Sequence, residues 1–136
     1  MGAGRPEPDL RHRALWLAIG YVLVLATVWG SLVPTPPDWP FLLGDKPLHA
    51  ATYGLLTFWF GQLYRGWRWH LALLLLFSAF GVLLEIAQAW WSIYRHFDMV
   101  DAAAGSAGAA CGLVLQRTPA GRWLVWVEER IAAGRS

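Results

Sequence analysis

The sequence predicts an all-α protein, a bundle of four transmembrane helices, from its composition and from four separate apolar segments. Hydrophobic residues make up 57% of the 136-residue chain and charged residues only 15%, a balance typical of membrane proteins. A helix of about 20 apolar residues matches the roughly 30 Å hydrocarbon thickness of a bilayer. The expected spans are residues 14–33, 48–64, 71–91 and 99–115. They leave no room for a soluble domain, so one membrane domain is predicted over residues 14–116.

The first predicted span is an uncharged run that follows Arg11, His12 and Arg13. A signal peptide is the rival interpretation, because basic residues also precede a signal core. Such a core usually has about 7 to 15 apolar residues, and no convincing cleavage site follows this longer run. We therefore expect a retained helix, preceded by a disordered cytoplasmic segment over residues 1–13.

The second span is predicted to begin as a helix near Asp45, ahead of its apolar segment. Asp45, His49 and Tyr53 are spaced by four residues, which stacks them along one helix face. Pro47 suits the first turn of such a helix, because the N–H that it lacks would have no helical partner there. The helix is thus expected to carry polar side chains inward from the outer surface.

The third and fourth spans carry further polar residues. Glu85 lies more than one turn from the outer end of the third span, and Gln88 lies one turn nearer that end. The fourth span is rich in Ala and Gly, so Gly105, Gly108 and Gly112 predict close contact with a neighbouring helix. Such contact would draw polar groups from different spans together.

Basic residues predict which loops lie in the cytoplasm. They precede the first span, join the second to the third and follow the fourth, whereas the opposite loops hold only Lys46 and Arg95. Both termini are therefore expected inside. Residues 117–136 should form a cytoplasmic interfacial tail with a short amphipathic helix. Its apolar face would hold Trp123, Leu124, Val127 and Ile131, and its polar face Glu128, Glu129 and Arg130.

Composition also excludes several classes of site and partner. A single Cys permits neither an intramolecular disulfide nor a metal site built on cysteine pairs. The net charge of +2 comes from basic residues beside apolar segments and not from a continuous soluble patch. Nucleic acid is therefore not an expected partner, whereas membrane lipids are.

The candidate site is a set of charged and polar residues on the outer side of the predicted bundle, because ionisable groups in or against hydrocarbon are costly and usually functional. Glu85 must be protonated, paired or hydrated, and it serves either as a proton acceptor or ligand, or as a structural partner of a neighbouring polar residue. The candidate catalytic residues are His49, Glu85 and Asp101, and the candidate substrate-binding residues are Asp45, Lys46, Tyr53, Gln88, Arg95 and Asp98.

Structural interpretations stand beside these roles. Asp45 and Asp98 suit helix caps, and Asp101 complements the positive end of the fourth span. Lys46 suits the membrane interface, and Arg95 would then pair with a carboxylate. No metal ligand is assigned, because the spacing matches no standard motif. A metal-assisted alternative would place Mg or Ca among His49, Glu85, Asp98 and Asp101.

Together the polar residues form the pattern Asp45-Lys46-x-x-His49 with Tyr53, Glu85-x-x-Gln88, and Arg95-x-x-Asp98-x-x-Asp101 with Gly108 and Gly112. This pattern, within residues 33–115, resembles the VanZ-like family of small bacterial membrane proteins. One position departs from it: the family usually has an Asn four residues after the second Asp, where this chain has Gly105.

The resemblance implies a multi-pass protein of the bacterial inner membrane that works at the outer face on cell-envelope precursors or their lipids. The family takes its name from a member associated with resistance to the glycopeptide teicoplanin. The resemblance supplies no established reaction, and it is the sole link to antibiotic resistance.

Three functions compete at this point. In the first, the protein binds or modifies a phosphate-bearing envelope lipid such as a lipid-linked cell-wall precursor, held by Lys46 and Arg95, while His49 or Glu85 moves a proton. In the second, Glu85 is the proton relay of a small transporter or lipid flippase. In the third, the polar residues lock the bundle or dock a partner enzyme, and the protein is an accessory to an envelope complex.

Overall fold

The computed structural model describes residues 10–33, 45–93 and 96–135, with the backbone alone for Asp45. All regular secondary structure in these ranges is helical, which confirms the predicted all-α class. The elements are α1 (Arg13–Leu32), α2 (Asp45–Leu63), α3 (Trp67–Trp91), α4 (Met99–Gln116), the 3-10 turn η1 (Pro119–Arg122) and α5 (Trp123–Ala133).

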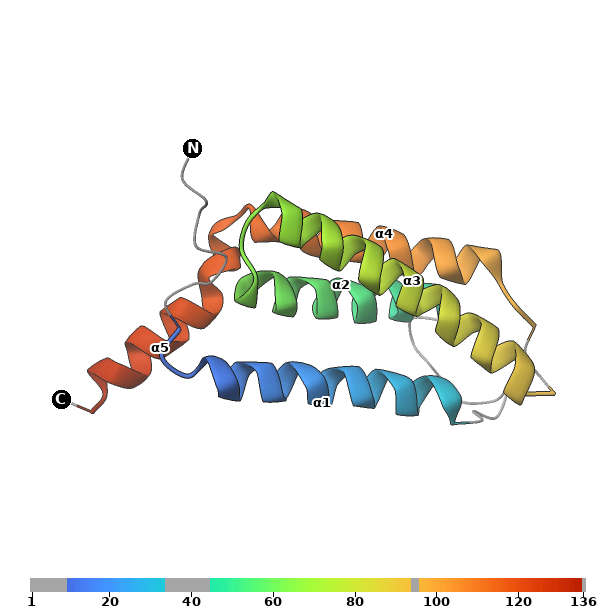
Figure 1. Ribbon diagram of the computed structural model, residues 1–136, viewed down its shortest axis with the longest axis horizontal. Coiled ribbons are helices and arrows are strands. Elements are labelled where there is room, and N and C mark those ends of the chain that lie inside the picture. Colours follow the sequence, from blue (N-terminus) through green and yellow to red (C-terminus); the bar gives the residue numbers. More distant parts are fainter. Residues whose placement is uncertain (1–9, 34–44, 94–95, 136) are drawn as a thin grey trace.

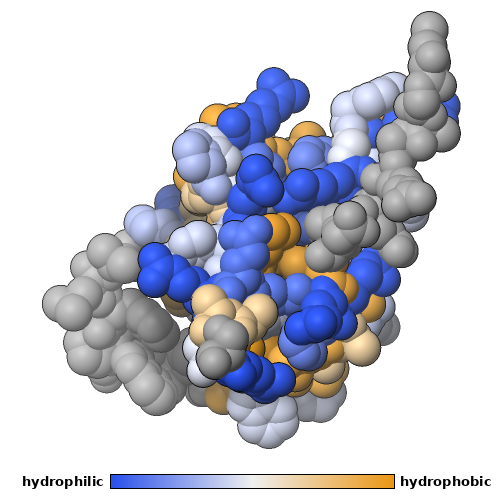
Figure 2. Space-filling model, turned by 90° about the vertical axis from the view of Figure 1, so that its left-hand side faces the viewer, coloured by the Kyte–Doolittle hydropathy of each residue, from blue (hydrophilic) through white to orange (hydrophobic). Residues whose placement is uncertain are grey.

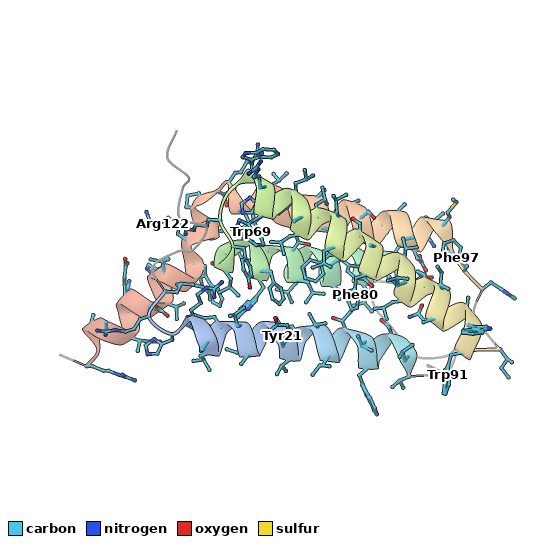
Figure 3. All side chains as sticks on the ribbon, viewed as in Figure 1. Tyr21, Trp69, Phe80, Trp91, Phe97 and Arg122 are labelled. Atoms are coloured by element: carbon cyan, nitrogen blue, oxygen red, sulfur yellow. The ribbon has the colours of Figure 1, made fainter. Side chains whose placement is uncertain are left out.

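Helices α1 to α4 run side by side and alternate in direction (Figure 1). One end of the bundle, here called the arginine end, holds the starts of α1 and α3 and the ends of α2 and α4. Helix α5 leaves the bundle at this end. The opposite end, here called the cluster end, holds the starts of α2 and α4. In Figure 3, Trp91 and Phe97 lie at the cluster end, and Trp69 and Arg122 lie toward the arginine end.

Three of the helices, α1, α3 and α4, are long and apolar enough to cross a membrane. Helix α2 is comparable in length, with 19 residues, but more polar. It buries Thr57 and Gln62 among the other helices, and a helix that faces protein tolerates polar side chains that lipid would not. The predicted spans coincide with α1 to α4, although α2 and α3 begin before their apolar segments. The predicted start of α2 near Asp45 is confirmed.

Helices α2 and α4 make the most extensive contact of the bundle, and glycine permits it. A Cβ atom on Gly108 would meet the backbone carbonyl of Ala50, and one on Gly112 would meet that of Gly54. Close backbone approach is a main source of helix association in lipid. The predicted close contact is therefore confirmed for Gly108 and Gly112, whereas Gly105 faces a side chain, as described below.

Aromatic residues join α1 to α2 toward the arginine end. The rings of Trp16 and Trp59 meet edge to face with centroids 6.1 Å apart, and the Trp59 indole donates a hydrogen bond to the carbonyl oxygen of Trp16 at 3.0 Å. Gly20 lies against Phe60, where a Cβ would approach the ring to 2.8 Å. These contacts fix the first half of α1 against the bundle.

The carboxylate of Glu128, in α5, binds the start of α1. It accepts hydrogen bonds from the backbone N–H groups of Arg11 (2.6 Å) and His12 (2.8 Å) and from the Trp16 indole (2.7 Å). The first residues of a helix leave N–H groups without helical partners, and α1 has no side-chain cap at His12. Glu128, predicted on the polar face of the tail helix with Glu129 and Arg130, thus faces the start of α1 and not solvent, and its side chain is only 9% exposed.

The segment before α1 also differs from expectation. Leu10 is buried and Arg13 begins the helix, so the predicted disorder is wrong for residues 10–13. Residues 1–9, expected to be disordered as well, lie outside the described residues. The predicted C-terminal helix forms as α5, and Leu124 anchors it: its side chain is buried and its backbone N–H donates to Oε1 of Gln62 at 2.9 Å.

Hydrophilic side chains cover much of the arginine end, which faces the viewer in Figure 2. Arginines from every connection at this end contribute to that surface. They come from the starts of α1 and α3, the end of α4 and η1, and include Arg13, Arg68, Arg117 and Arg122. The cluster end carries a different set of charges, which form the candidate site.

Candidate functional site: a polar cluster beside a lateral cleft

Three helices bring ionisable side chains together at the cluster end. His49 lies in the second turn of α2, Glu85 in the last two turns of α3 and Asp101 in the first turn of α4. Because α3 runs opposite to α2 and α4, its last turns lie beside their first turns. These three residues, together with Lys46 and Asp98, are here called the polar cluster.

His49 and Glu85 form the buried centre of the polar cluster. Nε2 of His49 lies 2.9 Å from Oε1 of Glu85, and the two side chains are 14% and 5% exposed. A buried carboxylate is costly without a partner, so this contact accounts for an acidic residue within α3. Oε1 of Glu85 nevertheless accepts no aligned hydrogen bond from the residues that the structure describes. The pair is thus a close approach in which Oε1 of Glu85 has bonding capacity left over.

Lys46 lies between two carboxylates of α4 at the rim of the cluster. Its Nζ atom is 3.7 Å from Oδ2 of Asp98 and 3.6 Å from Oδ1 of Asp101. The lysine side chain is about half exposed, and ion pairs of this kind contribute little to stability. Oδ1 of Asp101, which is buried, accepts no hydrogen bond within the described part of the chain. Asp101 therefore resembles Glu85 in having an inward oxygen with spare bonding capacity.

Asp98 has the structural role that its position predicted. It is the N-cap of α4, and its Oδ1 atom accepts a hydrogen bond from the backbone N–H of Val100 at 2.8 Å. Asp101 follows in the first turn, where its negative charge complements the helix dipole. The cap leaves the second oxygen of Asp98 directed toward Lys46.

Gln88 and Tyr53 extend the site in two directions. The Gln88 side chain donates to the backbone carbonyl of Ser31 at 2.8 Å and so joins α3 to the end of α1. The Tyr53 ring, buried in α2, packs between Gly81 and Gly105. A Cβ on Gly105 would lie 2.8 Å from Cδ2 of Tyr53, so the ring fills space that a larger residue at position 105 would need.

Two of the predicted binding residues cannot be located in the site by their side chains. The side chain of Asp45 and the whole of Arg95 lie outside the described residues. Asp45 begins α2 at the cluster end, and Arg95 lies in the sequence between the end of α3 and the start of α4.

A lateral cleft of about 400 Å³ opens between α1 and α2 and leads to the polar cluster. Its walls are mainly apolar, and His49, Tyr53 and Gln88 line its inner end. The α1 side of the cleft consists of Leu23, Ala26, Thr27, Gly30, Ser31 and Val33. The sequence did not predict this cleft, although the short side chains on the last turns of α1 were a visible sign of space between the helices.

One ligand atom from each of His49, Glu85 and Asp101 lies within 4.8 Å of the other two. The metal-assisted alternative predicted from the sequence included Asp98 as a fourth ligand, but in the structure Asp98 is the N-cap of α4. The three remaining side chains combine an imidazole with two carboxylates. This set can transfer protons, pair with a cationic group or bind a metal ion.

No protein-family model, curated protein or solved structure matches the chain.

Proposed function

We propose that the protein is a four-span protein of the bacterial inner membrane that binds, and modifies, a phosphate-bearing envelope lipid. The observation that carries the proposal is the lateral cleft that leads from the lipid-facing side of α1 and α2 to His49 and Gln88. A lipid has one apolar and one charged part, and the cleft and polar cluster offer a matching environment for each. The VanZ-like pattern supports the same assignment.

The charges of the two bundle ends support one orientation in the membrane. Arginines occur at every connection of the arginine end, while Asp98 and Asp101 lie at the cluster end. The positive-inside rule then places the arginine end and both termini in the cytoplasm and the polar cluster at the outer face. In this proposal α2 crosses the membrane together with α1, α3 and α4, and its buried polar residues face the helices that cover it.

Each group in the site has a role in this proposal. The hydrocarbon chain lies in the cleft, and Lys46 and Arg95 bind the phosphate. The Lys46 ammonium is suited to this because half of its side chain is exposed, so it can turn from its ion pairs with Asp98 and Asp101 toward a phosphate. His49 and Glu85, in contact at 2.9 Å, form a proton donor and acceptor for reaction at the head group.

Mass spectrometry of the lipids retained by gently purified protein tests this function. The natural sequence is compared with the double variant Lys46→Ala, Arg95→Ala, and a control carries Arg68→Ala and Arg117→Ala at the arginine end. A specific phospholipid or polyprenyl phosphate should be retained by the natural protein and the control and lost from the first variant. The same unselective lipid profile in all three proteins contradicts the proposal.

An accessory role is the second candidate, and the pairing of His49 with Glu85 favours it. In that case the polar cluster stabilises the bundle without contacting a ligand. The transport alternative gains less support, because the two buried polar residues of α2 are engaged within the protein: the Thr57 hydroxyl donates to the Tyr53 carbonyl of its own helix, and Gln62 Oε1 accepts from the backbone N–H of Leu124 in α5. Retention of one lipid class by the natural protein, lost on substitution at the cluster end alone, separates lipid binding from the accessory role.

A further inference from the structure

We infer that His49, Glu85 and Asp101 form a binding site for a divalent metal ion of the Zn²⁺ or Mn²⁺ class. The three side chains come from α2, α3 and α4, and one ligand atom from each lies within 4.8 Å of the others. Imidazole is a ligand for Zn and related transition metals, and carboxylates suit Mn as well as Mg and Ca. A mixed set of one imidazole and two carboxylates therefore favours Zn²⁺ or Mn²⁺ over the all-oxygen ions.

The distances are close to those of a coordination sphere. Ligand atoms about 2.1 Å from a common metal, at angles of 90° to 110°, are roughly 3.0 to 3.4 Å apart. His49 and Glu85 already approach to 2.9 Å, and the 4.8 Å limit on the group requires only a small inward shift.

Burial and unused bonding capacity distinguish this group from a surface cluster of acids. Glu85 is 4% exposed and Asp101 is 8% exposed, and each has a buried oxygen that accepts no hydrogen bond from the described residues. Two carboxylates in a weakly polar environment repel each other and need a compensating charge. A dication at their meeting point supplies that charge and also bonds to His49.

Lys46 gives the site a further testable property. Its ammonium lies 3.6 Å from Oδ1 of Asp101, so it competes with a metal ion for the same oxygen. Because the lysine side chain is about half exposed, it can turn toward solvent when a metal ion binds. Replacing Lys46 by Met should therefore strengthen metal binding, although the same change should weaken binding of an anionic head group.

The metal also offers a reason for an acidic cluster in a phosphate-binding protein, an extension that rests on the proposed function. Three protein ligands leave coordination positions for other groups on a Zn²⁺ or Mn²⁺ ion. A phosphate oxygen or a water molecule can occupy them at the inner end of the cleft, which His49 lines. The metal would then balance the two carboxylates and attract the phosphate, and His49 and Glu85 would act as its ligands in place of the proton donor and acceptor of the metal-free site.

Titration of the chelator-treated full chain in detergent with Mn²⁺, followed by the electron paramagnetic resonance signal of the free ion, tests the site without any lipid. Glu85→Gln and Asp101→Asn should each weaken binding about tenfold or more, since even residues that only support metal ligands have effects of that size. Asp98→Asn is the matched control, because it removes the same charge and Asn retains the helix cap. Its effect should stay below about threefold, and Lys46→Met should increase affinity.

Equal weakening by the Asp98, Glu85 and Asp101 variants would show diffuse attraction to negative charge and overturn the inference. Absence of stoichiometric Mn²⁺ and Zn²⁺ binding by the natural protein would do the same. Spin-echo spectroscopy of the Mn²⁺-bound natural protein needs no variant and should show coupling to an imidazole nitrogen. That coupling should vanish in His49→Gln and persist in His96→Gln, and its absence from the natural protein contradicts the site. The metal titration contains no lipid, so a failure to bind metal would not decide the outcome of the lipid-retention experiment.

Discussion

Glu85 is the residue whose environment decides between a structural and a chemical role for the cluster. Its contact with His49 is buried, so Glu85→Ala should lower the free energy of unfolding by about 3 kcal/mol, because a buried pair of polar groups is broken in a weakly polar environment. Unfolding in mixed detergent micelles, measured for both single variants and the double variant with His49→Ala, gives the coupling energy. Fully additive effects would show that the contact contributes no stability.

Gly105 stands where the VanZ-like family usually has Asn, and its surroundings show whether this chain could hold an Asn there. The Tyr53 ring occupies the space beside it, so Gly105→Asn should destabilise the bundle by about 1 to 3 kcal/mol through overpacking. In a Tyr53→Ala background the same Gly105→Asn change should cost less, because the ring that it would overlap is absent. Gly30→Ala is the control, because a Cβ there meets nothing within 4 Å. Thermal unfolding checks both; equal stability of the Asn variant and the natural protein would contradict the packing argument.

At the scale of elements, the attachment of α5 to α1 depends on one carboxylate. Burial raises the pKa of Glu128, but hydrogen bonds from the Trp16 indole and from the His12 and Arg11 backbone, with the nearby His12 ring, hold it below its ordinary value. The folded state thus favours the ionised form. Its contribution to stability is complete above the unfolded pKa, near 4.5, and is lost as the pH falls through the lower folded pKa.

Glu128→Gln should therefore lower stability at pH 7 by about 1 kcal/mol, the usual contribution of a helix N-cap. The difference from the natural protein should shrink as the pH falls below 4.5. Glu129→Gln is the matched control, because the neighbouring side chain is exposed. Thermal unfolding at several pH values measures both variants, and a constant difference at all pH values would exclude the ionised cap as the cause.

The positions of the helices and the contact between α2 and α4 were predictable from the sequence. Long apolar runs set the positions of α1 to α4, and the small residues Gly108 and Gly112 identified the contact between α2 and α4. The position of Glu128 was not predictable in the same way. It depends on the angle at which α5 leaves the bundle, and no local periodicity in the sequence encodes that angle.

At the scale of the whole molecule, part of the candidate site was predictable from the sequence and part was not. Alternating helices place His49, Glu85 and Asp101 at one end, so their proximity was foreseeable from spacing and direction alone. The division of labour between Asp98 and Asp101 was left open by the sequence and needed the observed cap. The Ser31 carbonyl that binds Gln88 had no signal at all, because every residue carries a backbone acceptor.

Helix α1 packs against α2 over its first half and is separated from α2 by the lateral cleft over its second half. Glu128 and Trp59 bind its first turns, and Gln88 binds the carbonyl of Ser31 near its last turn. The aromatic contacts with α2 hold the first half of α1 independently of Glu128, whereas Gln88 binds its last turns. Loss of the Gln88 bond would therefore widen the cleft at the cluster end, while the contact between α2 and α4 stays intact.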